Sequence, residues 1–158
     1  MTARIRRVMT FALLGLTGAA PAASGERCGG QAVLERAARL AALPGGVPVR
    51  LIDPEFAPDP EPLRRLDAFV VREPDGALRP VIYVNCRSAL IARAQHSAVD
   101  VSILAAVLHH EAQHLRGASE PEARRAELEF LRTLLQREGQ LDAGRAYLQT
   151  LVAQLDRR

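Results

Sequence analysis

Residues 101–115 read VSILAAVLHHEAQHL, and this stretch decides the fold. Its first two turns are apolar on nearly every side, which is typical of a buried helix at the centre of a domain. Ser97 or Asp100 can cap the start of such a helix, and Gly117 can supply the left-handed residue that ends it. We therefore predict a central helix over Val101–Arg116 that carries several polar side chains into the interior.

The polar part of this helix contains the motif HExxH, formed by His110, Glu111 and His114. Residues four apart project from one face of a helix, so both imidazoles can reach a single metal ion. Glu111 lies about 100° round the helix, where its carboxylate can take a proton from water activated at the metal. The spacing therefore predicts His110 and His114 as metal ligands and Glu111 as the general base. His109 points away from this face, and we assign it no role.

A third protein ligand is expected on the next helix, predicted over Glu120–Arg137. Its candidates are Glu120, Glu122 and Glu127. Ser119 and Glu122 fit a capping box, in which Glu122 reaches back to the start of the helix. On a helical wheel Glu120 and Glu127 fall on the apolar face, where a glutamate needs a partner such as a metal ion. All three glutamates stay open as ligands on this reasoning.

The stretch Val107–Leu115, VLHHEAQHL, resembles the motif of the zincin superfamily of zinc metallopeptidases, an HExxH sequence with apolar flanks. This resemblance covers roughly residues 68–135, although Arg116 stands where an apolar residue is usual. The sequence EPEA at residues 120–123 is similar to the ExxA element that carries the third ligand in gluzincins, the branch that uses glutamate. The resemblance therefore implies that Zn²⁺ is held by His110, His114 and Glu120, with Glu111 as the catalytic base.

The same resemblance bears on the branch and on the substrate. Glu120 also stands where the metzincin branch places its third ligand, with Gly117 at the glycine of that branch. Metzincins need a methionine turn further along, however, and the only methionines here are Met1 and Met9. In zincins a strand such as Val81–Asn85 often lies above the active helix and binds an extended peptide by strand addition. The resemblance thus implies a gluzincin-like site with a peptide or protein substrate.

The rest of the sequence predicts an α+β fold. Strands are predicted at Val47–Ile52, Ala68–Arg72 and Leu78–Asn85, and further helices at Gln31–Leu43, Ser88–Ala94 and Leu141–Leu155. The sequence EPDG at residues 73–76 resembles a hairpin turn, and four prolines between Asp53 and Pro62 predict an irregular connection. We expect a small antiparallel sheet of about three strands, packed on the HExxH helix within a mainly helical single domain, residues 23–158.

The composition is that of an ordinary globular chain. Its 158 residues are 48% hydrophobic and 25% charged, which permits one domain with a core and excludes a disordered tail. The net charge is +3, and Arg4, Arg6 and Arg7 account for it, since 3 − 3 leaves zero for the remainder. We therefore predict no nucleic-acid partner.

Residues 1–22 have the pattern of a signal peptide. The three arginines precede an apolar run, Val8–Leu16, and small residues follow at 20–22. Because this run is too short to cross a bilayer, we predict an exported protein, periplasmic or secreted, with no stable membrane anchor after cleavage. In that setting Cys28 and Cys86 are expected to form a disulfide that fixes the N-terminal helix onto the body.

These observations predict a small, exported, zinc-dependent peptidase. One alternative is a catalytically inactive zincin-like binding module with a structural metal, and another is a metal-free adaptor that uses the last helix. Glu111 favours the peptidase, because a structural site needs no base. Tyr83, Tyr147 and His96 are the candidates for a donor that stabilises the oxyanion.

Overall fold

The computed structural model describes residues 28–43, 46–57 and 59–156, so the predicted signal peptide lies outside the described residues. In chain order, the elements are α1 (Gln31–Ala41), β1 (Val49–Ile52), the 3-10 helix η3 (Pro54–Phe56), α2 (Pro60–Leu63), β2 (Ala68–Arg72), β3 (Leu78–Asn85), α3 (Ala89–Ala94), α4 (Ala98–Leu115), α5 (Glu120–Arg137) and α6 (Leu141–Leu155). The expected α+β class, with a small sheet in a mainly helical domain, is confirmed.

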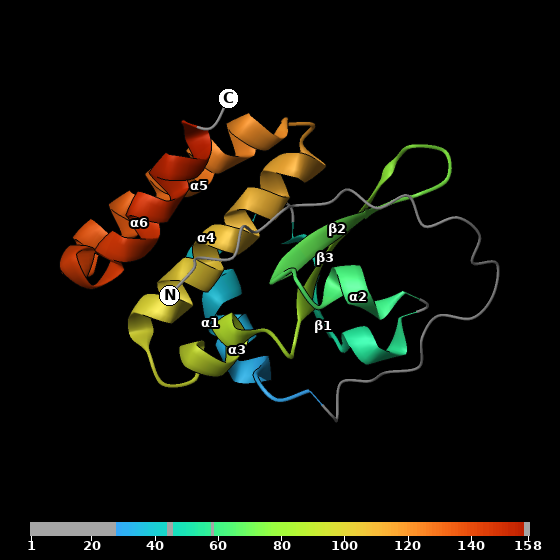
Figure 1. Ribbon diagram of the computed structural model, residues 1–158, viewed down its shortest axis with the longest axis horizontal. Helices are drawn as coiled ribbons and strands as arrows, with labels where there is room; N and C mark the ends of the chain where they lie inside the picture. Colours follow the sequence, from blue (N-terminus) through green and yellow to red (C-terminus); the bar gives the residue numbers. More distant parts are fainter. Residues whose placement is uncertain (1–27, 44–45, 58, 157–158) are drawn as a thin grey trace.

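Helix α4 is the buried centre of the fold. It runs between the α5–α6 pair and the sheet, as Figure 1 shows, and α1 and α3 also pack against it. Leu104, Ala105 and Leu108 are fully buried, in agreement with the apolar character of this stretch. The helix begins earlier than predicted because the Ser97 hydroxyl accepts a hydrogen bond from the backbone N–H of Asp100, which places the cap at Ser97.

The sheet has three strands in the order β1-β3-β2. Strands β2 and β3 form the predicted antiparallel hairpin, whereas β1 runs parallel to β3, with Val49 opposite Ile82. The expectation of an entirely antiparallel sheet is therefore wrong for β1. Strand β2 already reverses the direction of β1, and the hairpin reverses the chain again, so β3 returns alongside β1 in the same direction.

The position of β3 also changes which strand offers a free edge. Residues 81–85 belong to the central strand and pair on both sides, so they offer no free edge. Over the described residues, β2 is paired on one side only, and it packs against α4. The sheet edge that faces the HExxH helix is therefore β2 and not β3.

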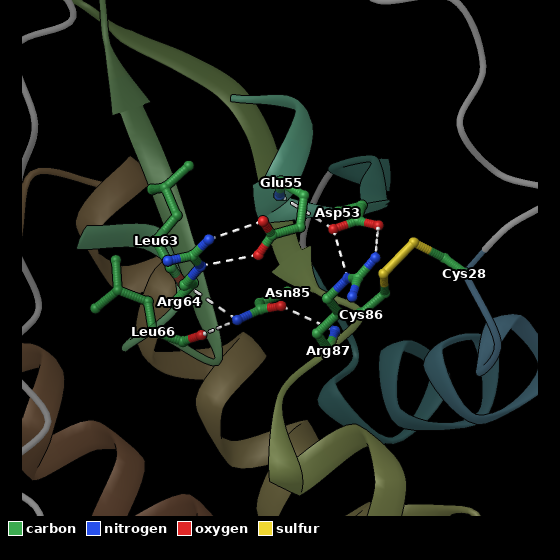
Figure 2. Close-up of polar contacts among 9 residues, drawn as sticks. All are labelled: Cys28, Asp53, Glu55, Leu63, Arg64, Leu66, Asn85, Cys86 and Arg87. Carbon is green, nitrogen blue, oxygen red and sulfur yellow. Dashed lines mark hydrogen bonds and ion pairs between the residues drawn. A yellow bond between two sulfur atoms is a disulfide. The ribbon is translucent and has the colours of Figure 1, made fainter. Parts of the chain in front are cut away.

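A polar cluster holds the connection that follows β1 (Figure 2). Asp53 accepts two hydrogen bonds from the guanidinium of Arg87, at 2.7 and 2.8 Å. The buried Asn85 side chain donates to the carbonyls of Leu63 and Leu66, at 3.2 and 3.0 Å. These bonds give the proline-rich connection a defined path, and it contains η3 and α2 where an irregular segment was expected.

The predicted disulfide between Cys28 and Cys86 is present, with 5.5 Å between the two Cα atoms. It joins the residue that lies shortly before α1 to the residue directly after β3, and Figure 2 shows it beside Arg87. The crosslink therefore attaches the N-terminal end of α1 to the sheet. In the part of the chain that the structure describes, no helix combines the length and the apolar character needed to cross a bilayer.

Candidate metal centre

The site is built where α4 ends and α5 begins. The backbone N–H of Gly117 donates to the carbonyl of His114 at 2.9 Å, and that of Ala118 donates to the carbonyl of Gln113 at 3.0 Å. This pair of bonds is a Schellman motif, and Gly117 takes the left-handed conformation, φ 87°, that was predicted for it. The turn reverses the chain, so the first residues of α5 lie next to the histidines of α4.

Three potential ligand atoms converge beside this turn. Nε2 of His110 lies 3.1 Å from Nε2 of His114, and Oε2 of Glu120 lies 3.6 Å from the first and 3.2 Å from the second. Zinc bonds of 2.0–2.1 Å to tetrahedral ligands place two ligand atoms about 3.3 Å apart. The three distances therefore match three corners of a zinc tetrahedron, and two imidazoles with one carboxylate form a donor set that suits zinc.

Each histidine is also contacted through its other ring nitrogen. Nδ1 of His114 lies 3.0 Å from the carbonyl oxygen of Ala118, which the Schellman turn brings into place. Nδ1 of His110 lies 3.1 Å from Oε2 of Glu127, a buried carboxylate on α5. Oε1 of Glu127 accepts a hydrogen bond from the hydroxyl of Tyr147 on α6, at 2.9 Å. Both Nε2 atoms are thereby left to face Glu120.

The carboxylate of Glu120 is held from its other side. Nη2 of Arg124, one helical turn along α5, lies 2.6 Å from Oε1 of Glu120, which leaves Oε2 toward the histidines. Arg124 also donates to the side chain of Gln154 on α6. Burial alone would raise the pKa of Glu120, but the adjacent His110 and His114 hold it well below its usual range.

The contacts with carboxylates also change the pKa values of the two histidines. Burial opposes the charged form of His110, yet the carboxylates of Glu120 and Glu127 outweigh it and raise its pKa to about 10. The contact with Glu120 also raises the pKa of His114. The group therefore concentrates carboxylate charge around two imidazoles, which is the electrostatic setting that favours a bound cation.

Glu111 is the most enclosed acid of the site. Its side chain is only 1% exposed, and Oε2 has no hydrogen-bond partner among the described residues. Burial raises the pKa of Glu111 to about 7, against the opposing effect of His110 and His114. A buried carboxylate oxygen without a partner is costly, so Oε2 of Glu111 is an unsatisfied acceptor beside the His/His/Glu group.

Glu111 is among the lining residues of two pockets. The first, of about 170 Å³, lies between residues 66–68 and helices α4, α5 and α6. The second, of about 310 Å³, lies between the β2–β3 hairpin and the end of α4. Strand β2 contributes to both, through Ala68 in the first and through Phe69 and Val70 in the second. A ligand in either pocket could therefore contact both β2 and Glu111.

The other candidates lie elsewhere. The carboxylate of Glu122 accepts hydrogen bonds from the backbone and the hydroxyl of Ser119, so it forms the capping box and faces away from the histidines. The ring of Tyr83 stacks on Phe69, and its hydroxyl accepts a hydrogen bond from Arg79. His96 precedes α4, about 20 Å along the helix axis from His110.

The sequence analysis did not identify two groups that contact the candidate ligands, the Arg124 side chain and the Ala118 carbonyl. Arg124 follows Glu120 by four residues, a spacing that places both on one face of α5 and could have indicated the pair. The Ala118 carbonyl carries no sequence signal, because any residue at that position presents the same group. His109, to which no role was assigned, stacks on Phe130 with 4.5 Å between the ring centroids.

Comparisons with protein-family models, with curated proteins and with solved structures found no match to this chain. Its class is therefore defined by its own fold and site. The chain is an α+β domain in which a central helix and the helix after it present a His/His/Glu group that could bind a metal ion.

Proposed function

We propose that the protein is an exported zinc-dependent peptidase. The observation that carries the proposal is the triangle of His110, His114 and Glu120, whose ligand atoms lie 3.1–3.6 Å apart beside the buried carboxylate of Glu111. Zinc held by these three residues would polarise a peptide carbonyl and lower the pKa of water toward about 7. The disulfide and the basic and apolar pattern of residues 4–22 support export to the periplasm or the medium.

The protein's own residues would perform the proton transfers. Glu111 would accept the proton of the attacking water as a general base and then donate it to the leaving amine as a general acid. An extended peptide along β2 would reach Glu111 from the two pockets that this strand lines.

The metal is tested by elemental analysis of the protein without residues 1–22, produced with the disulfide formed. Wild type is expected to contain stoichiometric zinc, and His114→Ala and Glu120→Ala are expected to lose it. Glu122→Ala is the matched control, because this carboxylate belongs to the capping box. Wild type that carries no zinc, even after reconstitution, would contradict the proposal.

Catalysis is tested separately with Glu111→Gln and a library of quenched fluorescent peptides. The variant is expected to keep zinc but to cleave about 10²- to 10⁴-fold more slowly than wild type, which is the usual contribution of a general base. Equal rates for the zinc-loaded variant and wild type would instead support the inactive binding module with a structural metal.

A further inference from the structure

Glu127 is a buried acid that the proposed reaction does not use. It is 5% exposed, it lies on α5, and its two oxygens face different helices. Oε2 lies 3.1 Å from Nδ1 of His110 on α4, and Oε1 accepts the hydroxyl hydrogen of Tyr147 on α6 at 2.9 Å. A buried carboxylate requires such partners, and here one is a histidine of the candidate metal centre and the other is a tyrosine of α6.

The two nitrogens of His110 face different carboxylates. Glu120 lies on the Nε2 side, together with His114, whereas Glu127 lies on the Nδ1 side. A histidine that binds a metal through Nε2 donates its Nδ1 hydrogen to an acceptor, which fixes the tautomer and the angle of the ring. Nδ1 of His110 is buried and makes no hydrogen bond among the described residues, and Oε2 of Glu127, 3.1 Å away, is the carboxylate oxygen next to it. Glu127 therefore stands where an orienting acceptor would stand, and it does not complete the triangle of ligand atoms.

We propose that Glu127 and Tyr147 are positioning residues of the metal centre. Tyr147 holds the carboxylate of Glu127, and Glu127 in turn holds the ring of His110 so that Nε2 faces the ion. The C-terminal helix α6 thereby becomes an outer part of the site. This inference rests on the metal site of the proposed function, but it does not depend on peptide hydrolysis.

Two other roles for these residues are disfavoured by the same contacts. If Glu127 were a metal ligand, its oxygen would lie with the Nε2 atoms, and that place is taken by Oε2 of Glu120. If Tyr147 stabilised an oxyanion, its hydroxyl hydrogen would have to leave Oε1 of Glu127, and a buried carboxylate would lose a hydrogen bond.

The test measures Zn²⁺ affinity by competition with a chromophoric chelator, on intact Glu127→Gln, Tyr147→Phe and the double variant. The chain offers a matched control for each change: Glu129→Gln alters an exposed acid of the same helix, and Tyr83→Phe alters the other tyrosine. Circular dichroism and the melting temperature of the metal-free proteins establish that each variant is folded. Tyr147→Phe keeps the packed ring and removes only the hydroxyl.

Loss of the orienting acceptor typically weakens metal binding about 10- to 100-fold, and we expect this range for Glu127→Gln. Tyr147→Phe is expected to weaken binding by about 3- to 10-fold, since it acts through Glu127. The double variant should bind no more weakly than Glu127→Gln alone. The visible absorption of bound Co²⁺ should shift in both single variants, and both controls should match wild type.

The outcomes separate the two proposals. Variants that match wild type in zinc affinity and in Co²⁺ absorption would overturn the positioning role and leave the metal site intact. A complete loss of zinc in Glu127→Gln, as severe as in Glu120→Ala, would make Glu127 a ligand and also overturn it. Wild type without zinc would overturn the proposed function itself, and the positioning role with it.

Discussion

Two glutamates on one face of α5 contact different atoms of the candidate metal centre. Glu120 and Glu127 are seven residues apart on α5, and both point toward α4. The first meets the Nε2 atoms of two histidines and the second meets Nδ1 of His110. An acid becomes a candidate ligand or an orienting acceptor according to the ring nitrogen it faces.

Asp53 is a buried acid that binds Arg87, and we expect its contribution to the free energy of unfolding to depend on pH. The hydrogen bonds from Arg87 lower the pKa of Asp53 below its ordinary value of 3.8, despite the opposing effect of burial. A lowered pKa in the folded state contributes stability that is fully present above the unfolded pKa and is lost as the pH falls through the folded one. Asp53→Asn should therefore lower the free energy of unfolding by about 1–2 kcal/mol at pH 7.

Urea unfolding of wild type and Asp53→Asn at several pH values measures this dependence. The difference between the two proteins should shrink as the pH falls below about 4. Asp142→Asn, at an exposed aspartate on α6, is the control and should show little difference at any pH. A gap between wild type and Asp53→Asn that stays constant from pH 7 to pH 3 would contradict the prediction.

At the scale of residues, the sequence predicted which residues come together at the candidate metal centre better than it predicted their geometry. The spacing of His110 and His114 places both rings on one helix face, and the wheel places Glu120 and Glu127 on the apolar face of α5. Which nitrogen each glutamate approaches depends on the crossing of α4 and α5 and on the exact turn between them. A sequence pattern does not contain this information, so three glutamates stayed open until the structure placed them.

At the scale of elements, the turn between α4 and α5 couples backbone conformation to the metal centre. Gly117 adopts φ 87°, which costs a residue with a side chain roughly 1 kcal/mol. The next residue, Ala118, presents its carbonyl to Nδ1 of His114. Gly117→Ala is therefore expected to lower stability by about 1 kcal/mol and also to weaken zinc binding.

Gly139 offers a matched control for this change. It ends α5 in the same motif with φ 68°, and the N–H of Gln140 donates to the carbonyl of Leu135 there. Gly139→Ala should lower the free energy of unfolding by a similar amount without changing the affinity for zinc. Chemical denaturation and chelator competition on both variants measure the two effects, and equal zinc affinities would contradict the coupling.

The contact between α5 and α6 is close enough to require a glycine. A Cβ atom on Gly144 would lie 2.1 Å from Cδ1 of Leu135, which is fully buried. Helix propensity alone would make Gly144→Ala stabilising by about 1 kcal/mol. We expect overpacking to outweigh this gain, so that the variant is less stable by about 1–3 kcal/mol.

Thermal unfolding of Gly144→Ala tests the packing, with Ala143→Gly as the reference. Residue 143 is exposed on the same helix, so glycine there should cost only the propensity difference. Alanine is then favoured at position 143 and glycine at position 144. A higher melting temperature for Gly144→Ala would show that α5 and α6 can separate without cost.

Helices and strands were predicted more accurately than their arrangement. The bounds of β2, β3, α5 and α6 agree with the predictions, because capping residues, turn residues and apolar periodicity are local signals. The direction of β1 was not predictable in this way, since it depends on the path through η3, α2 and β2. The same path also determines that β3 lies at the centre of the sheet and β2 at its edge, so this strand order was not predictable from local signals either.

At the scale of the whole molecule, the disulfide joins two parts that the sequence separates by 58 residues. Closing a loop of this length restricts the unfolded chain and stabilises the fold by about 4 kcal/mol in the loop-entropy account. The double variant Cys28→Ser with Cys86→Ser should lose a stability of this order and still bind zinc below its unfolding midpoint.

Guanidinium titrations of the oxidised wild type and the double variant measure this loss. Reduced wild type is the control, because it lacks the crosslink but keeps the sequence, and it should unfold with the double variant. A shared midpoint for the oxidised and reduced wild type would show that the crosslink adds nothing to the fold.

The hydrogen bond from Tyr147 to Glu127 gives the molecule an order of assembly. A ribosome produces the sheet and both cysteines first, then the histidines of α4, and only later the tyrosine of α6. Contacts between neighbouring helices form quickly, because little chain separates them. Until α6 has folded against α5, the Glu127 carboxylate lacks the hydrogen bond from Tyr147, so the proposed anchoring of His110 is complete only after the last described helix is in place.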